Sequence, residues 1–381
     1  MNAFKQFLKI PGTYVGIVVA LAFQLIFFCV WLTAYDGVYE RAKEMRIAIV
    51  NQDTNMGNKI AGGLQNNLPF QVKKEESMEK AKEAMDERVY DMIIEIPPSF
   101  SKDISEKGKT DLNFHINQAN AMMAKQMMEG VAKQVNDNVN KEVSSYKQQM
   151  VAGKLQAMGS GSAEVIKGLT EDAVGITIHK VNDAKGFSIN MVPLMIVLAS
   201  FVGAMIMSME LYKASQLVES GLGNFFSRQC MNMVVAVVLA IITVVLMKFF
   251  HIQIQEPIVT VWLFQTIVFF AFLSLTQMFL NLFGNAGMLF NILSLSLQLV
   301  SAGVMVPHVM LSHTYQTIGK LLPATYAADG YYTIIFGGEN LTKNIMFLCI
   351  IIAVTQIITL IGYKISILLK KNQTVIKGNE A

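Results

Sequence analysis

The sequence predicts a polytopic α-helical membrane protein with six transmembrane helices and an α/β domain inserted between the first two. Three observations lead to this fold class. The chain of 381 residues is 53% hydrophobic and only 15% charged, whereas soluble domains carry about 25% charged residues. Residues 257–319 contain no Asp, Glu, Lys or Arg, enough for two helices of roughly 20 residues that each cross about 30 Å of hydrocarbon. Residues 35–186, in contrast, have the composition of a soluble domain.

Residues 1–12 are predicted to form a short cytoplasmic amphipathic helix, with Phe4, Phe7 and Leu8 on one face. That face is either an anchor on the membrane surface or a docking face for a cytoplasmic partner. The first transmembrane helix is expected at 13–34. We expect it to be retained, because it is too long for a signal peptide and lacks a small-residue cleavage site.

The soluble region, residues 35–186, alternates between strand and helix patterns and predicts a small α/β layer. Strands are expected at 46–51, 69–73, 89–96 and 111–116, and helices at 58–68 and 75–87. A long helix at 119–158 follows, with an apolar stripe that suits a single partner. The stripe includes Val131, Val135, Val139 and Val143. Its partner is either the returning extended segment at 175–181 or the same helix of a second copy.

The remaining chain, 187–369, is predicted to form five transmembrane helices, followed by a cytoplasmic tail at 370–381. The predicted helices lie at 187–209, 229–247, 258–282, 287–306 and 344–363. The third and fourth of these are joined by only four residues, 283–286, and therefore form an antiparallel hairpin. Residues 210–228 are expected to be a polar loop.

The orientation follows from the Lys and Arg residues of the short loops, which concentrate on the cytoplasmic side. With both termini inside, the cytoplasmic segments carry Lys5, Lys9, Lys213, Arg228, Lys364, Lys370, Lys371 and Lys377. The short external segments carry only Lys248, Lys320 and Lys343. The sequence therefore predicts cytoplasmic termini and an extracellular α/β domain.

Motifs for catalysis and for nucleotide binding are absent from the sequence. No Gly-x-x-x-x-Gly-Lys-Ser/Thr phosphate loop occurs, and no hydrolase or zinc-protease motif is found. The three Cys and five His are scattered without the spacing of metal ligands. We therefore predict that the chain is not an enzyme, holds no cofactor or metal, and does not bind nucleic acid. Because the predicted spans also lack ionisable residues at mid-depth, another chain must supply the energy for any transport.

Two groups of motifs resemble known families. The layout of one crossing, a large external domain and five more crossings is similar to that of type-2 ABC exporter permeases, as is a motif after the fifth helix. We expect this motif to form an external gate, and its residues are Gly303, Pro307, Leu322, Pro323 and Tyr326. The segments RIAIVNQD at 46–53 and DMIIEIPPSFS at 91–101 resemble the Pip/YhgE phage-infection-protein domain. This domain is short here, about 150 residues.

The resemblance implies a dimeric permease in a bacterial plasma membrane, driven by a separate ABC ATPase subunit that binds ATP and Mg²⁺. It implies that the fifth helix ends at the Gly…Pro pair and that short external or re-entrant helices precede the sixth. The implied ATPase-coupling residues are Glu210, Lys213, Glu219, Arg228, Phe4, Phe7 and Leu8. The implied cargo is amphiphilic, such as a lipid, a peptide, a drug or a lipid-linked polymer. The alternative is a non-transporting surface, adhesion or phage-receptor-like protein, or an accessory of a secretion system.

Overall fold

The computed structural model describes residues 26, 30, 33–158, 173–182, 187–217, 222–338 and 340–379. The chain forms two compact units. An α/β unit contains Tyr39–Ala184 together with Phe336–Glu339. A helical unit contains Met1–Val38, Lys185–Ile335 and Asn340–Ala381. The first predicted transmembrane helix, 13–34, lies almost entirely outside the described residues.

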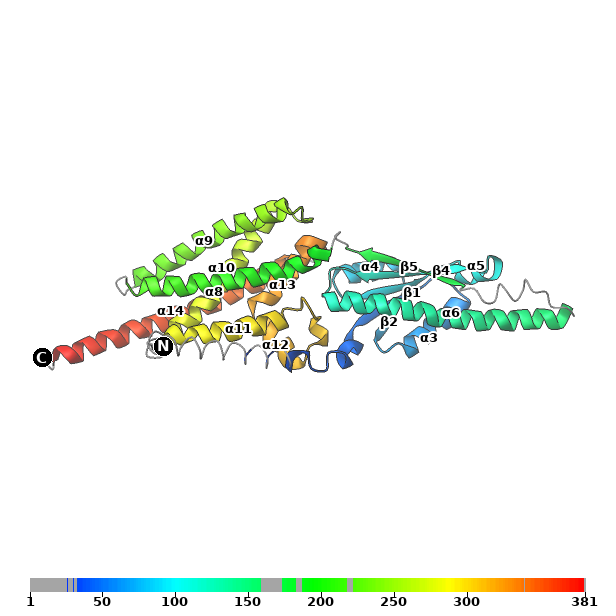
Figure 1. The fold of residues 1–381 in the computed structure, drawn as a ribbon, viewed down its shortest axis with the longest axis horizontal. Coiled ribbons are helices and arrows are strands. Elements are labelled where there is room, and N and C mark those ends of the chain that lie inside the picture. The colour runs from blue at the N-terminus through cyan, green and yellow to red at the C-terminus, as the bar shows by residue number, and fades with distance from the viewer. Residues whose placement is uncertain are drawn as a thin grey trace, which may run out of the picture. The chain divides into compact units, whose positions relative to one another are not determined.

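The α/β unit is built on a five-stranded sheet with the order β2-β1-β3-β4-β5 (Figure 1). The strands are β1 (Arg46–Asn51), β2 (Gln71–Glu75), β3 (Met92–Ile96), β4 (Thr110–Asn117) and β5 (Val174–Val181). Neighbouring strands are parallel, except for β3 and β4, which are antiparallel. The alternating strands and helices predicted from the sequence are confirmed, with small shifts at their ends. The returning segment is the edge strand β5.

Four α-helices pack on this sheet: α3 (Met56–Asn67), α4 (Met78–Asp86), α5 (Phe100–Glu106) and α6 (Met122–Met158). On one face, Ala81 and Met85 of α4 form a buried cluster with Ala48, Val50 and Ile93 of the central strands. Burying such apolar side chains stabilises the fold by roughly 1.5–3 kcal/mol for each large one.

The apolar stripe of α6 packs on the sheet of its own chain. The four valines of the stripe are buried, and α6 contacts β4 and β5. Asn140 fixes the register, because its side-chain amide donates to the Val174 carbonyl oxygen at 2.7 Å and accepts from the Val174 N–H at 2.7 Å. Asn136 donates to the same carbonyl oxygen at 3.1 Å. Of the two partners predicted for the stripe, the structure provides the returning segment.

A carboxylate in this unit gives it a testable pH dependence. The side chain of Asp91 accepts hydrogen bonds from the Arg46 N–H at 2.9 Å and from the Asn120 amide at 2.8 Å. Burial nevertheless dominates and raises the pKa of Asp91 to about 6. Since this exceeds the unfolded value, the folded state binds the extra proton as the pH falls from 7 to 5. Asp91 should therefore make the unit more stable at pH 5 than at pH 7, by on the order of 1 kcal/mol. Burial lowers the pKa of His115, and this group acts in the opposite direction.

Hydrogen exchange of the β1 and β3 amides in the full chain measures this effect, once intrinsic exchange rates are corrected. Asp91→Asn should remove the gain between pH 7 and pH 5. Asp137→Asn, on the exposed face of α6, should leave it. The assignment to Asp91 is wrong if the Asp91→Asn variant keeps the full pH dependence.

The helical unit consists of long apolar helices joined by short segments (Figure 1). They are α8 (Val192–Ser215), α9 (Leu222–Phe249), α10 (Ile258–Phe283), α11 (Gly287–Ser301), α12 (His313–Leu321), α13 (Pro323–Phe336) and α14 (Thr342–Asn379). Short 3₁₀ turns lie at Phe187–Met191, Gly284–Ala286 and His308–Met310. Among the described residues, four stretches are long and apolar enough to span a bilayer: Ile189–Ser215, Gly223–Phe249, Ile258–Ser301 and Thr342–Ile365.

Helix α10 is the packing centre of this unit. It contacts α8, α9, α11 and α14, and Phe264, Val268 and Phe272 are fully buried. In contrast, α9 and α14 expose large apolar side chains such as Val238 and Ile357. Exposed apolar surface of this extent suits contact with lipid. The first helix of the charge-free stretch is thus the core of the unit.

The predicted hairpin at 283–286 is confirmed by the packing of α10 against α11. Gly284 has a φ of +61° and ends α10. After the turn, a Cβ at Gly287 would lie 2.4 Å from the Phe279 carbonyl oxygen, so only glycine allows this approach. Further from the turn, the Asn291 amide donates to the Thr276 carbonyl oxygen at 3.2 Å. The two helices therefore run back along each other.

The predicted helix 287–306 is shorter than expected. Helix α11 ends at Ser301, and its 15 residues span about 22 Å, less than the hydrocarbon thickness. Gly303 has a φ of +75°, a conformation that ends helices. The apolar composition continues past this point, which is why the sequence pattern extended the helix to Val306. The two short helices implied by the resemblance follow as α12 and α13.

The predicted polar loop at 210–228 is also shorter than expected. Helix α8 continues to Ser215 and α9 begins at Leu222. Glu210 and Lys213 therefore lie in the last turns of α8, and Arg228 lies two turns inside α9. Polar residues of this type extend helices readily. Hydropathy alone placed the helix ends at the edge of the apolar run.

Candidate functional site

A buried polar cluster around Gln265 joins four helices of the helical unit. Gln265 lies in the first third of α10 and is 1% exposed. The amide nitrogen donates to Ser200 Oγ of α8 at 3.0 Å and to Thr243 Oγ1 of α9 at 3.3 Å. The amide oxygen accepts a hydrogen bond from the Tyr331 hydroxyl of α13. A buried amide left without partners would be costly, so this cluster fixes the relative positions of the four helices.

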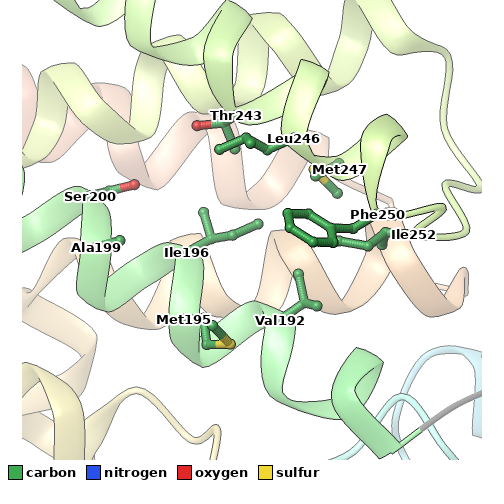
Figure 2. Close-up of a pocket in the computed structure, with 10 residues that line it drawn as sticks. All are labelled: Val192, Met195, Ile196, Ala199, Ser200, Thr243, Leu246, Met247, Phe250 and Ile252. Carbon is green, nitrogen blue, oxygen red and sulfur yellow. The ribbon is translucent and has the colours of Figure 1, made fainter.

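Next to this cluster, α8 and α9 border an open cavity of about 250 Å³. Ser200 and Thr243 line it, together with Ala199 and an otherwise apolar wall. Figure 2 shows side chains from both helices facing the same space. The apolar wall consists of Val192, Met195, Ile196, Leu246, Met247, Phe250 and Ile252. We call this space the α8–α9 cavity.

The chemistry of the α8–α9 cavity is that of an amphiphile site. Its wall offers aliphatic, thioether and aromatic groups, which favour a hydrocarbon chain or an aromatic ring. The hydroxyls of Ser200 and Thr243 are the polar groups at its edge, and Gln265 holds both. Within the described residues, no charged side chain lines this cavity. A ligand here would be bound by apolar contacts and oriented by hydroxyl hydrogen bonds.

A second polar cluster joins α9, α10 and α14. The Gln277 amide donates to Asn232 at 3.0 Å, and Gln229 donates to Gln277 at 3.4 Å. From α14, the Gln356 amide donates to Gln229 at 2.8 Å and to Ser274 at 2.9 Å. Like the Gln265 cluster, it consists of neutral residues. Neither cluster was predicted from the sequence, where only ionisable residues in the spans would have indicated a site. The available signal was the spacing of Ser274, Gln277 and Asn281, which lie on one face of a charge-free helix.

The predicted ATPase-coupling residues divide into three groups. Glu210 and Lys213 are exposed and form an ion pair of 2.7 Å at the end of α8. Arg228 is buried, with 6% exposure, so its prediction as an exposed loop residue is wrong. Phe4, Phe7, Leu8 and Glu219 lie outside the described residues. The coupling role of these seven residues stays a prediction.

Arg228 is held by neutral partners inside the bundle. One guanidinium nitrogen donates to Asn281 Oδ1 of α10 at 2.9 Å, and another donates to Ser215 Oγ of α8 at 3.3 Å. The guanidinium also lies 5.9 Å from the centre of the Tyr363 ring of α14. It thereby connects α9 with three other helices at the end of the bundle opposite the α8–α9 cavity.

The predicted gate-motif residues lie at the turns around α12. A Cβ at Gly303 would lie 2.7 Å from the His308 ring, so the turn requires glycine. Pro307 precedes the 3₁₀ turn at His308–Met310, Leu322 ends α12, and Pro323 begins α13.

Tyr326 ties the start of α13 to two neighbours. Its hydroxyl donates to the Lys320 carbonyl oxygen at 2.8 Å. Its ring stacks on Phe347 of α14, with centroids 4.7 Å apart. These contacts connect the segment that follows α11 with α14. The role of these residues as a gate stays a prediction.

Comparison with known proteins identifies the family. The family model described as "ABC-2 family transporter protein" matches residues 15–361, most of the chain. The chain belongs to the ABC-2 transporter family. Proteins of this family are the membrane components of transporters and work with separate ATPase subunits. The multi-pass helical unit, with its apolar helices, agrees with membership in the ABC-2 family.

Two individual similarities accompany the ABC-2 match. The "Uncharacterized protein YhgE" of Bacillus subtilis (strain 168) is 25% identical over 175 residues, which are 45% of this chain and 22% of that protein. The chain therefore matches less than a quarter of the length of this curated relative. A crystal structure described as "a domain of a putative ABC type-2 transporter" from Thermotoga maritima MSB8 is 18% identical, with a TM-score of 0.28. That similarity covers 36% of this chain and 85% of the other.

Proposed function

We propose that this chain is the membrane-spanning permease subunit of an ATP-driven exporter that moves an amphiphilic substrate out of the cell. The observation that carries the proposal is the α8–α9 cavity, which places an apolar wall beside two hydroxyls inside the membrane unit of an ABC-2 protein. The substrate class is a lipid, peptide, drug or lipid-linked polymer, each with an apolar part that suits this wall.

The proposed orientation has both termini in the cytoplasm and the α/β unit outside a bacterial plasma membrane. In this orientation the end of α8 and the start of α9 face the cytoplasm. The α8–α9 cavity lies at the other end of these helices and therefore in the outer half of the bilayer. A substrate held there would be close to the surface at which export ends.

The energy for transport comes from a separate ABC ATPase that binds ATP and Mg²⁺, since the sequence has no phosphate loop. We assign its docking surface to the end of α8, where Glu210 and Lys213 are exposed. Two copies of the permease, identical or not, form the membrane unit.

The docking surface can be tested by pulling down the ATPase with the full chain from native membranes. Glu210→Lys and Lys213→Glu should each weaken the association by about tenfold and increase its salt sensitivity, as rim charges do. Because an exposed ion pair contributes at most about 1 kcal/mol to folding, the protein itself should stay folded.

Lys248→Glu is the matched control, because Lys248 is exposed at the opposite end of α9. It should leave the ATPase association unchanged. If no ATPase subunit copurifies with the wild-type chain, the exporter proposal is wrong and the surface-protein alternative is favoured. If Lys248→Glu weakens association as much as Glu210→Lys does, the docking surface and the proposed orientation are wrong.

A further inference from the structure

The α/β unit contains a second cavity, of about 590 Å³, between three of its helices. Asn55, Met56 and Lys59 line it from the start of α3, and Ser101, Ile104 and Ser105 from α5. Glu142, Tyr146 and Gln149 complete it from α6. These positions are one turn apart on each helix, so each helix presents a single face to the cavity. Its volume falls in the range of small-molecule sites, about 300–1,000 Å³.

The charges around this cavity are already compensated within the protein. Lys59 and Glu142 are its charged lining residues, and they lie 3.4 Å apart as an ion pair. The starts of α3 and α5 would attract anions, but Asp53 occupies both. Its carboxylate accepts hydrogen bonds from the Gly57 N–H at 2.8 Å and from the Ser101 N–H at 3.2 Å. It also accepts one from the Ser101 hydroxyl at 2.5 Å. The cavity therefore offers little net charge that could attract an ionic ligand.

The cavity instead offers neutral hydrogen-bonding groups. Within the described chain, no hydrogen bond occupies the side-chain amides of Asn55 and Gln149 or the hydroxyl of Tyr146. Amides and hydroxyls both donate and accept hydrogen bonds. The Tyr146 ring is 45% exposed and offers an apolar face. Met56 and the buried Ile104 add apolar contact at the base.

From this combination we infer that the cavity between α3, α5 and α6 binds a neutral oligosaccharide. Sugar hydroxyls also both donate and accept, so they match amide and hydroxyl side chains. The C–H faces of a sugar ring pack on an aromatic ring, which Tyr146 supplies. A sugar ligand also needs no net charge from the site. The inference concerns the α/β unit only and does not depend on transport or on the ATPase.

The test uses the full chain in phospholipid nanodiscs, which avoids the sugar headgroups of common detergents. The labelled protein is applied to a printed array of neutral glycans, together with anionic sugars and neutral tetrapeptides. The strongest neutral glycan is then titrated. Tyr146→Ala and Gln149→Ala should each weaken its binding by about tenfold, or 1.4 kcal/mol. Tyr146→Phe should keep most of the affinity, because the ring face remains.

Matched controls lie close by on the same unit. Gln148 is exposed on another face of α6, and Tyr39 is 77% exposed outside the cavity. Gln148→Ala and Tyr39→Ala should bind the glycan like wild type. The inference is overturned if no neutral glycan binds or if the Tyr146→Ala and Gln149→Ala variants bind unchanged. It is also overturned if only anionic sugars or peptides bind. None of these results affects the proposed transporter.

Discussion

Arg228→Glu is expected to abolish accumulation of folded protein. The wild-type guanidinium is buried and donates to Asn281 Oδ1 and to Ser215 Oγ. A carboxylate in its place would face the Asn281 oxygen and the electron-rich face of the Tyr363 ring. Burying an ionised carboxylate that has no hydrogen-bond donor or opposite charge beside it typically costs several kcal/mol, and the guanidinium hydrogen bonds are lost as well. Such a loss is comparable to much of the stability of a typical domain, about 5–15 kcal/mol.

The measurement is the yield of monodisperse full chain after detergent extraction, together with its thermal midpoint. Arg228→Lys should be intermediate, because one ammonium cannot reproduce the planar fork of the guanidinium. Lys213→Glu, on the exposed end of α8, should give wild-type yield. From the sequence alone, Arg228 is predicted to be an ATPase-coupling residue, and in that role Arg228→Glu would weaken ATPase docking without misfolding. Normal yield and midpoint for this variant would restore that prediction and contradict the structural role.

Ala199→Trp is expected to stop export while leaving the protein folded. Ala199 lines the α8–α9 cavity and is exposed, so an indole there can enter the cavity without displacing a packed core. Occupying the space removes the apolar contacts that an amphiphile would make. With the ATPase present in proteoliposomes, transport of a fluorescent phospholipid analogue should fall by at least about tenfold, which corresponds to 1.4 kcal/mol of lost binding.

The matched control is Val238→Trp, at an exposed apolar position of α9 that does not line the cavity. It adds the same indole to a surface suited to lipid and should leave transport unchanged. Retention on size exclusion and basal ATP hydrolysis should be the same in both variants. Undiminished transport in the Ala199→Trp variant would exclude the α8–α9 cavity as the substrate site.

The sequence predicted those features that depend on periodicity and on long charge-free runs. The α/β order followed from alternating patterns at 46–51 and 111–116. The hairpin followed from four residues between two apolar helices. The ends of α8, α9 and α11 were less predictable. A hydropathy pattern ends where polar residues begin. A helix ends where the backbone leaves the helical conformation, as it does near Gly303 with its positive φ.

The polar clusters of the candidate site depend on contacts between helices that are distant in sequence, so no local pattern predicts which residues pair. Gln265 is a single amide in an apolar helix, and its partners Ser200, Thr243 and Tyr331 are distant in sequence. Arg228 likewise lies in a polar stretch that is typical of a loop. Only the folded structure, in which it contacts Asn281, shows that it is buried. Pairings of this kind arise from the packing of four or more helices, which a single sequence does not encode in any one window.

The α/β unit is built from two separate segments of the chain, and this affects the order in which the chain folds during synthesis. This unit includes Phe336–Glu339, far along the chain from Tyr39–Ala184. The Lys125 ammonium lies 4.7 Å from the centre of the Phe336 ring. Gly338 passes so close to the Asp86 carbonyl oxygen that a Cβ would lie 2.8 Å from it. At 5–20 residues per second, roughly 8–30 s separate synthesis of Ala184 from that of Glu339. The sheet can form early, but its last segment arrives only after α8 to α13 have been made.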